Sequence, residues 1–287
     1  MPETENRVDH NRQQKAAVIN DFTSFGRCSL AVTIPILSAM KVQCCSVPTA
    51  IFTNHTGFRN FSWTDYTAKM DDYIRDWKAT GLRFDAIMTG FLGSKAQVEF
   101  VHRFLDAFRD EKTIVCVDPV MGDYGRLYAT YDRELAESMR GFLSVADILT
   151  PNLTEACVLA GRDYASDLSD DELFALCRSL GVKKIVVTGI VRGDELVNFV
   201  YEEGREPVKV TEPKIGPDRS GTGDVFSAVV LAEAIRGENF VDSVAKAARY
   251  ITATVRRTTE MALPVTDGLA IEETLSLLME TAKGGRT

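Results

Sequence analysis

Short apolar runs and longer stretches of helical spacing alternate along the first half of the chain. The apolar runs cover 16–20, 43–52, 85–91 and 113–120, and the stretches that follow them cover 30–40, 64–79, 94–109 and 132–143. Runs of the first kind are typical of strands, and apolar residues repeated every three or four positions are typical of amphipathic helices. This order predicts consecutive parallel βαβ units.

The second half first continues this order and then departs from it. A strand at 146–150, helices at 154–160 and 170–180, and a strand at 183–188 that ends at Gly189 follow the earlier pattern. Within the strand at 183–188, residues 185–187 are apolar at successive positions, as burial on both faces requires. The next segments, 195–201 and 207–210, predict a hairpin, and the remaining predicted elements are helices at 225–235, 240–256 and 268–283.

Length and composition indicate one large α/β domain. The chain has 287 residues, of which 45% are hydrophobic and 26% charged, and it contains neither an internal repeat nor a Pro/Gly-rich linker. We expect a single domain over 16–287, preceded by a polar, disordered tail at 1–15.

Charge and cysteine usage narrow the function classes. A net charge of −8 argues against a nucleic-acid binder, which usually concentrates Lys and Arg on one face. The six cysteines show no CxxC pair and no zinc spacing, so we expect buried thiols. With no apolar run of about 18 residues and no signal-peptide core, we expect a cytoplasmic protein that does not enter a membrane.

Polar residues follow several of the predicted strands. In an open parallel sheet, ligands bind beyond the carboxyl ends of the strands. The loops expected on that rim start at Asn20, Phe52, Thr89, Asp118, Thr150 and Thr188.

Gly221, Thr222, Gly223 and Asp224 lead into the apolar helix predicted from 225. Two glycines let the backbone approach an anion, and the amides at a helix start favour negative charge. Asp224 could accept a proton from a substrate hydroxyl. Alternatively, it is an ordinary N-cap after a glycine-rich turn.

The motif DPVMGD places Asp118 and Asp123 after a buried strand. Carboxylates at strand ends can hold hydrated Mg²⁺ together with phosphate oxygens. An Asp-Pro pair is also a common way to open a turn, so both interpretations stay open.

The motif TPNLTE, 150–155, follows the next strand and enters a helix. Asn152 and Glu155 have the spacing of a capping box. In the functional alternative, Glu155 holds a metal-bound water and Asn152 faces phosphates, and the two interpretations are compatible.

The loop 52–58, FTNHTGF, is polar and flanked by aromatic residues. Such a loop can stack on a flat heteroaromatic ring and hydrogen-bond its edge. A single histidine is more often structural than catalytic, so we assign His55 no proton transfer.

The three motifs DPVMGD, TPNLTE and GTGD, in this order, are similar to those of the ribokinase-like superfamily of small-molecule kinases. TNHTG resembles the substrate loop of pyridoxal kinases, and the stretches 21–30 and 35–40 resemble the bacterial pyridoxamine kinase branch. The resemblance runs from about Ala16 to the last helix. It implies a three-layer α/β/α sandwich with a central, mostly parallel sheet.

The resemblance also implies an activity, which is phosphorylation of the 5′-hydroxymethyl group of a B6 vitamer by ATP. Asp224 would be the base, and the amides of Gly221, Thr222 and Gly223 would form the anion hole. Mg²⁺ and a monovalent cation such as K⁺ are the expected ions, and a homodimer is the expected assembly.

Further roles carried over from the resemblance concern ATP, the cations and the vitamer. The expected ATP-binding residues are Asp118, Glu155, Thr188 and Asn152; the expected metal ligands are Asp118, Asp123, Thr150 and Glu155; the expected substrate-binding residues are Asp21, Thr56, His55 and Asp224. The segment 121–128 would be a flap over ATP.

One departure from the family pattern concerns the substrate. Many pyridoxal kinases have a serine where this chain has Asp21, and a carboxylate can accept from a protonated amine, which favours pyridoxamine. The alternatives are a hydroxymethylpyrimidine kinase, against which TNHTG argues, and a non-catalytic vitamer-binding protein. The second has no need of both a base and a phosphate-charge apparatus.

Overall fold

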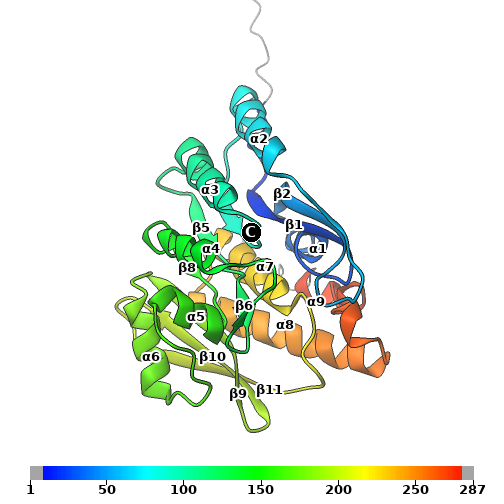
Figure 1. Cartoon of the computed structure of the whole chain (residues 1–287), viewed down its shortest axis with the longest axis vertical. Helices are drawn as coiled ribbons and strands as arrows, with labels where there is room; N and C mark the ends of the chain where they lie inside the picture. The colour runs from blue at the N-terminus through cyan, green and yellow to red at the C-terminus, as the bar shows by residue number, and fades with distance from the viewer. Residues whose placement is uncertain (1–8, 280–287) are drawn as a thin grey trace, which may run out of the picture.

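A mostly parallel sheet runs through the middle of the protein (Figure 1). The computed structural model describes residues 9–279. Its strands are β1 Lys15–Phe25, β2 Gln43–Asn54, β3 Trp63–Asp65, β4 Ala86–Thr89, β5 Ile114–Val117, β8 Ile148–Leu149, β9 Lys184–Arg192, β10 Glu195–Glu202 and β11 Val208–Pro213. They lie in the order β11-β10-β9-β8-β5-β4-β1-β2-β3, and a separate hairpin pairs β6 Gly122–Asp123 with β7 Arg126–Leu127.

The sheet is parallel in its centre and antiparallel at its edges. Each neighbouring pair from β2 to β9 is parallel, whereas β3, β10 and β11 are antiparallel to their neighbours. The predicted βαβ units and the predicted hairpin, now β10 and β11, are therefore confirmed.

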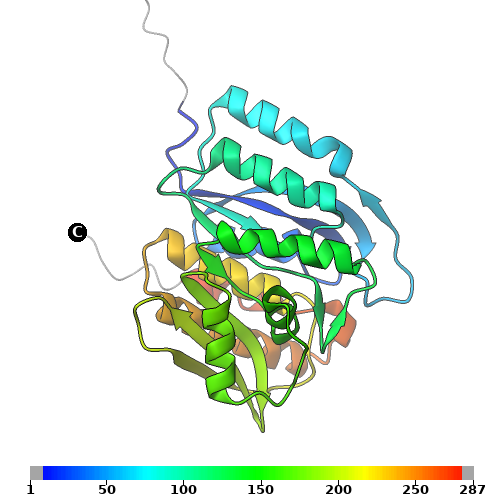
Figure 2. The same ribbon diagram turned by 60° about the vertical axis from the view of Figure 1, so that its left-hand side comes forward.

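Helices cover both faces of the sheet, as Figure 2 shows. On one face lie α1 Leu30–Ala39, α7 Thr222–Ile235 and α8 Phe240–Glu260; on the other lie α2 Thr67–Thr80, α3 Lys95–Phe108, α4 Arg133–Ser138, α5 Leu153–Ala160 and α6 Asp170–Ser179. The predicted three-layer sandwich is confirmed.

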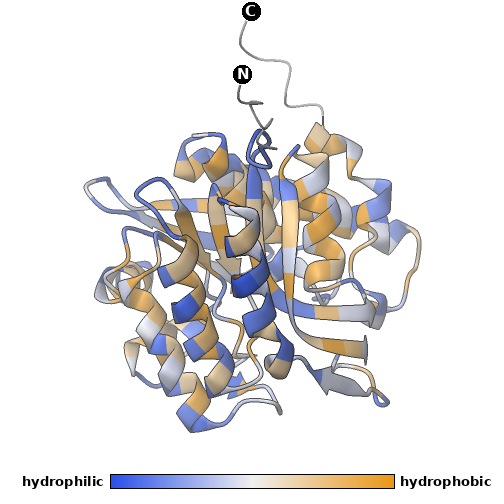
Figure 3. Cartoon of the chain, turned by 90° about the horizontal axis from the view of Figure 1, so that it is seen from above, coloured by the Kyte–Doolittle hydropathy of each residue, from blue (hydrophilic) through white to orange (hydrophobic). Residues whose placement is uncertain are grey.

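Each face of the sheet has its own hydrophobic core. Along β1, Ala17 and Ile19 pack with the α2–α6 layer, whereas Ala16 and Val18 pack with α1, α7 and α8. Successive side chains of a strand point to opposite faces, so a strand between two helical layers must be apolar at every position. In Figure 3 the hydrophobic colour gathers on the strands and on the helices beside them.

Three strands extend further than predicted. The expected loop at Asn20 is wrong, because β1 runs on to Phe25 as a two-stranded ribbon with β2, past an irregular register between Asn20 and Phe22. Likewise β2 ends at Asn54, and β9 continues through Gly189, where a positive φ of 72° accompanies an irregularity in its pairing with β10.

Two predicted helices in the first half of the chain differ from the structure in their bounds. The expected helix at 64–79 begins only at α2, because 63–65 form the edge strand β3. The expected helix at 132–143 is divided between α4 and the 3-10 helix η1 Met139–Ser144.

The predicted C-terminal helix at 268–283 is wrong within the described residues. The 3-10 helices η2 Val265–Asp267 and η3 Ile271–Glu273 and the short α9 Ser276–Met279 replace it, and residues 280–283 lie outside the described range. Thr258 on α8 accepts a hydrogen bond from the backbone amide of Ala270. The segment forms short backbone turns of its own, and Thr258 ties it to α8.

The predicted tail at 1–15 falls partly on residues 1–8, which lie outside the described range. The side chain of Asn11 bonds the carbonyl of Gly81 and the amide of Arg83.

All six cysteines are unpaired, and four of them, Cys28, Cys116, Cys157 and Cys177, are buried. Within residues 9–279, no helix has the length and apolar character needed to cross a membrane.

Candidate active site

The candidate site lies where the order of strands reverses. The chain passes from β1 to β2 on one side and later returns to β4 on the other side of β1. The carboxyl ends of strands on either side of such a point diverge, and this is where open α/β sheets bind ligands. Asn20 lies on β1 at this point.

The first turn of α7 packs closely against the loop between β1 and α1. Gly221 is the N-cap, with a φ of 82°, and a Cβ placed on it would lie 2.1 Å from the carbonyl oxygen of Arg27. A glycine is needed here both for the backbone angle and for the contact. The amides of Thr222 and Gly223 follow in the first turn, where a helix has no internal acceptors for them.

Asp224 is the third residue of α7, so its interpretation as the N-cap is wrong. Its carboxylate is half-buried, and Oδ1 accepts a hydrogen bond of 3.0 Å from Nδ2 of Asn20. Burial raises the pKa of Asp224 above its usual range, and hydrogen bonds from the Ser29 amide and Asn20 oppose that rise. A carboxylate in such a place is a candidate general base.

Asp118, at the end of β5, is buried beside the start of α7. Its Oδ2 accepts a 2.9 Å hydrogen bond from Oγ of Ser227, which is 2.8 Å from Oγ1 of Thr150. Burial, and then the charge of Asp224, raise the pKa of Asp118 well above its usual value. The structure thus brings together the predicted residues Asp118, Thr150 and Asp224.

Glu155 has a structural role at the start of α5. It completes a capping box with Asn152, and its Oε1 also accepts a 3.1 Å bond from the amide of Met121. The capping prediction is confirmed. Burial and the charge of Asp118 raise the pKa of Glu155 well above its usual range.

Asn152 and Thr188 lie side by side on the rim. The two residues form an isolated parallel bridge, and the Thr188 amide bonds the carbonyl of Pro151. The amide of Asn152 is engaged within the chain, because Nδ2 donates to the carbonyl of Gly122 and Oδ1 accepts from Glu155.

The segment predicted to be a flap contains the β6–β7 hairpin. Asp123 is exposed on this hairpin, and its Oδ1 accepts a bond from the amide of Tyr124. The hydroxyl of Tyr124 bonds the carboxylate of Asp218 in the segment before α7. The hairpin therefore reaches from the α5 side of the rim to the α7 side, and Asp123 is exposed whereas Asp118 is buried.

Asp21 is buried in β1 next to Asn20. Its Oδ2 accepts a 2.7 Å bond from the hydroxyl of Thr23, and burial raises its pKa to about 6. Thr56 is exposed in the loop after β2, where its hydroxyl makes no hydrogen bond to another described residue.

Both ring nitrogens of His55 have partners in the chain. Nδ1 accepts a 3.0 Å bond from the amide of Gly57, so Nε2 carries the proton and donates to the carbonyl of Thr266 at 2.8 Å. His55 thus ties the loop after β2 to the C-terminal segment.

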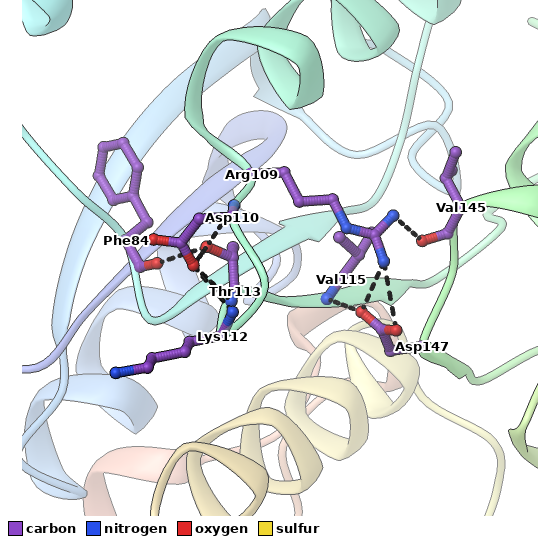
Figure 4. A network of polar contacts seen from close by, with 8 residues as sticks. All are labelled: Phe84, Arg109, Asp110, Lys112, Thr113, Val115, Val145 and Asp147. Atoms are coloured by element: carbon purple, nitrogen blue, oxygen red, sulfur yellow. Dashed lines mark hydrogen bonds and ion pairs between the residues drawn. The ribbon is translucent and has the colours of Figure 1, made fainter.

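The two ends of the parallel strands differ in electrostatics. At the amino ends of β5 and β8, Asp147 pairs with Arg109 at 3.2 Å and accepts from the amide of Val115 (Figure 4). At the carboxyl ends, Asp118 and Glu155 form no ion pair with any residue of 9–279. A cluster of buried acids without a cation favours a positively charged ligand.

The acids fit a partial cation site and not a complete cage. No group of three or more His, Cys, Asp and Glu side chains within residues 9–279 is placed to hold a metal by itself. Mg²⁺ usually takes one or two carboxylates together with water and phosphate oxygens, so Asp118 fits such an ion when a phosphate is also present.

Sequence reasoning missed two residues of the site, Asn20 and Ser227. Asn20 is fully buried at the end of an apolar run, and Ser227 is almost fully buried in an apolar helix. A polar residue within an otherwise apolar strand or helix could have identified them, because a buried polar side chain needs a hydrogen-bond partner.

Comparisons with known proteins identify the family of this chain. The phosphomethylpyrimidine kinase family model matches residues 34–266. The pyridoxal kinase of Arabidopsis thaliana is 32% identical, over 72% of this chain and 70% of its own, and the pyridoxine kinase of Bacillus subtilis is 31% identical, over 69% and 74%.

Among solved structures, the chain is similar to a Bacteroides thetaiotaomicron protein assigned as a phosphomethylpyrimidine kinase and crystallised in one form with pyridoxal. The identity is 34% and the TM-score 0.91, over 95% of this chain and 98% of that one. The chain therefore belongs to the phosphomethylpyrimidine kinase family and, within the ribokinase-like superfamily, to the pyridoxal kinases.

Proposed function

We propose that this protein transfers the γ-phosphoryl group of ATP to the 5′-hydroxymethyl group of a B6 vitamer. The observation that carries this proposal is the placement of Asp224, held by Asn20 in the first turn of α7 beside Asp118. The relatives named as pyridoxal and pyridoxine kinases support the substrate class, as does the similar structure with pyridoxal.

In this proposal, Asp224 takes the proton of the vitamer hydroxyl as the oxygen attacks phosphorus. The raised pKa of Asp224 makes it a stronger base than an exposed aspartate. The amides of Gly221, Thr222 and Gly223 lie at the positive end of α7, where they offset charge that develops on the phosphate oxygens.

Asp118 would hold Mg²⁺ together with phosphate oxygens of ATP, and Asp123, Thr150 and Glu155 are the other candidate ligands for Mg²⁺ or K⁺. Bound there, Mg²⁺ supplies positive charge that screens the phosphates from the buried acids. Thr188 and Asn152, side by side on the same rim, would contact the nucleotide phosphates.

Replacing Asp224 by Asn tests the base assignment. The Asn oxygen can still accept from Asn20, so folding and binding should persist while kcat falls by about 10²–10⁴-fold. Isothermal titration with ATP and a vitamer provides the control for binding. A near-parental kcat would show that Asp224 is not the base.

A substrate panel tests the reaction class. ADP release would be measured with pyridoxamine, pyridoxal, pyridoxine and hydroxymethylpyrimidine, each with Mg²⁺ and with or without K⁺. We expect B6 vitamers to be the preferred substrates, and a strong preference for the pyrimidine would overturn the proposal.

We further propose that Asp21, Thr56 and His55 line the vitamer site and that Asp21 favours pyridoxamine. The carboxylate of Asp21 can accept from a protonated amine, whereas a serine is neutral. Asp21→Ser should therefore lower kcat/KM for pyridoxamine more than for pyridoxal. The same ratio in the parent and the variant would remove the basis of this assignment.

We also propose a cytoplasmic homodimer. The apolar side chains Ile51, Phe61 and Trp63 are exposed near the edge strand β3, where a second copy could cover them. Light scattering of the purified chain tests the assembly, and cell fractionation tests the location.

A further inference from the structure

Asn20 joins three separate segments at the reversal of strand order. Its side chain is fully buried on β1. Oδ1 accepts two hydrogen bonds, one of 2.9 Å from the amide of Asp21 and one of 2.8 Å from the amide of Phe91 after β4. Nδ2 donates to Oδ1 of Asp224 on α7 at 3.0 Å. One side chain thus connects β1, the β4–α3 segment and α7.

The orientation of the Asn20 amide is fixed by its partners. Two backbone amides can donate only to the oxygen, so the NH₂ group must be the end that faces Asp224. Gly90 closes the remaining side, because a Cβ on this residue would lie 2.4 Å from Cγ of Asn20. The side chain is therefore held by three hydrogen bonds and lies close against the backbone of Gly90.

The neutral amide of Asn20 is also a suitable hydrogen-bond donor to a carboxylate that acts as a base. A lysine in its place would stabilise the carboxylate strongly and weaken it as a proton acceptor, whereas a neutral amide donor orients the carboxylate with little loss of basicity. An acid in an imposed orientation is what an in-line transfer needs, because misplacement by about 1 Å can cost 10²-fold in rate.

We propose that Asn20 is a positioning residue that acts through Asp224, with Nδ2 orienting the base and Oδ1 holding the strand ends together. This inference rests on the proposed function, since it assigns Asn20 a part in the same phosphoryl transfer.

The Asn20→Asp variant separates the orienting role of Nδ2 from the structural role of Oδ1. The carboxylate of the variant has nearly the same shape and can keep both bonds from the backbone amides, but two carboxyl groups then face each other and share one proton, which raises the pKa of the pair and removes the neutral donor beside an ionised Asp224. We expect kcat to fall by about 10–100-fold while the KM values for ATP and vitamer stay within about threefold.

Gln97→Glu is the matched control. Gln97 is also fully buried, its Oε1 accepts from the amide of Gly93, and its Nε2 donates to the carbonyl of Thr49. This variant loses an equivalent buried donor but has no bond to Asp224. Its kcat should remain within about twofold of the parent at temperatures where it is folded.

A double-mutant cycle distinguishes action through Asp224 from a purely structural role, because it compares the effect of Asn20→Asp with and without the Asp224 carboxylate. If Asn20 acts through the base, Asn20→Asp should cost little in the Asp224→Asn background, measured by single-turnover phosphorylation. An equal loss in both backgrounds, or a parental kcat in Asn20→Asp alone, would overturn the inference. Asn20→Ser enters the same cycle if the Asp variant does not fold.

The two proposals fail in distinguishable ways. A parental kcat in Asp224→Asn would remove the base assignment itself. An inactive Asp224→Asn combined with a parental Asn20→Asp would leave that assignment intact and remove only the role of Asn20.

Discussion

Oγ of Ser227 lies 2.9 Å from Oδ2 of Asp118, and it joins the helix that carries Asp224 to the carboxyl end of β5. Ser227 follows Asp224 by three residues, so the two side chains extend from the same region of α7. Through this bond, the position of the candidate base depends on the position of the candidate metal ligand.

Replacing Ser227 by Ala should disturb Asp118 in particular. The buried carboxylate would lose its only hydrogen-bond donor among residues 9–279, at a cost of about 1–3 kcal/mol in the free energy of unfolding. We expect kcat/KM for ATP to fall about tenfold, measured over a range of Mg²⁺ concentrations.

Ser243→Ala is the control for this change. Ser243 is buried on α8, where its hydroxyl bonds the carbonyl of Asn239 and has no contact with the site. It should lose stability without losing activity. If the two variants have the same kcat/KM, the bond between Ser227 and Asp118 has no catalytic importance.

Gly221→Ala should damage both folding and activity. The added Cβ meets the carbonyl oxygen of Arg27 at 2.1 Å, so α7 or the loop before α1 must move. The left-handed backbone adds a cost of about 1–2 kcal/mol. Thermal unfolding and kcat measured together should both fall.

The Gly237→Ala variant separates the free-energy cost of the left-handed backbone from the effect of the steric contact with Arg27. Gly237 has a φ of 80°, close to the 82° of Gly221, but a Cβ added to it would meet no atom of residues 9–279 within 4 Å beyond its own chain neighbours. This variant should lose only the backbone share of the stability and keep its kcat. Equal loss of activity in both variants would contradict the importance of the contact with Arg27.

Much of the architecture could be predicted because its signals are local. Apolar runs such as 16–20 reflect burial on both faces, and the capping box of Asn152 and Glu155 is written within four consecutive residues. The strand extension beyond Asn20 could not be predicted, because it depends on pairing with β2 and not on the composition of β1.

The contacts of the candidate site, by contrast, join residues that are far apart in the sequence. Asn20 and Asp224 are 204 positions apart, and Asp118 and Ser227 are 109 positions apart. Such pairs follow from the strand order and from the packing of α7, which no local pattern determines. The motif acids could be predicted individually, but Asn20 and Ser227, which hold Asp224 and Asp118, could not.

Asp21→Asn should change the pH dependence of stability. Burial raises the pKa of Asp21 from 3.8 to about 6, so the native state binds more protons than the unfolded state between these values. The ionised group therefore lowers stability increasingly as pH rises through this window, by up to about 3 kcal/mol above pH 6. The variant should be more stable than the parent at pH 7, and this gain should vanish near pH 4.

Urea unfolding of Asp21→Asn and Asp147→Asn at several pH values tests whether the change in the free energy of unfolding has the expected sign. Asp147 is paired with Arg109 at the opposite end of the sheet, so its replacement removes a favourable contact. It should yield no gain at pH 7. A loss of stability at pH 7 in Asp21→Asn would show that hydrogen bonds to this carboxylate outweigh the cost of its burial.

His55 offers a test of structure against chemistry, because glutamine and asparagine each imitate one of its nitrogens. Gln can place its amide near the position of Nε2 and keep the bond to the Thr266 carbonyl, whereas Asn can keep only the bond from the Gly57 amide. If His55 only holds the loop, His55→Gln should keep most activity, and His55→Asn should raise KM for the vitamer by about 3–10-fold with little change in kcat. Steady-state kinetics of both variants decide the matter, since a proton-transfer role would require kcat to collapse in both, whatever the bond to Thr266.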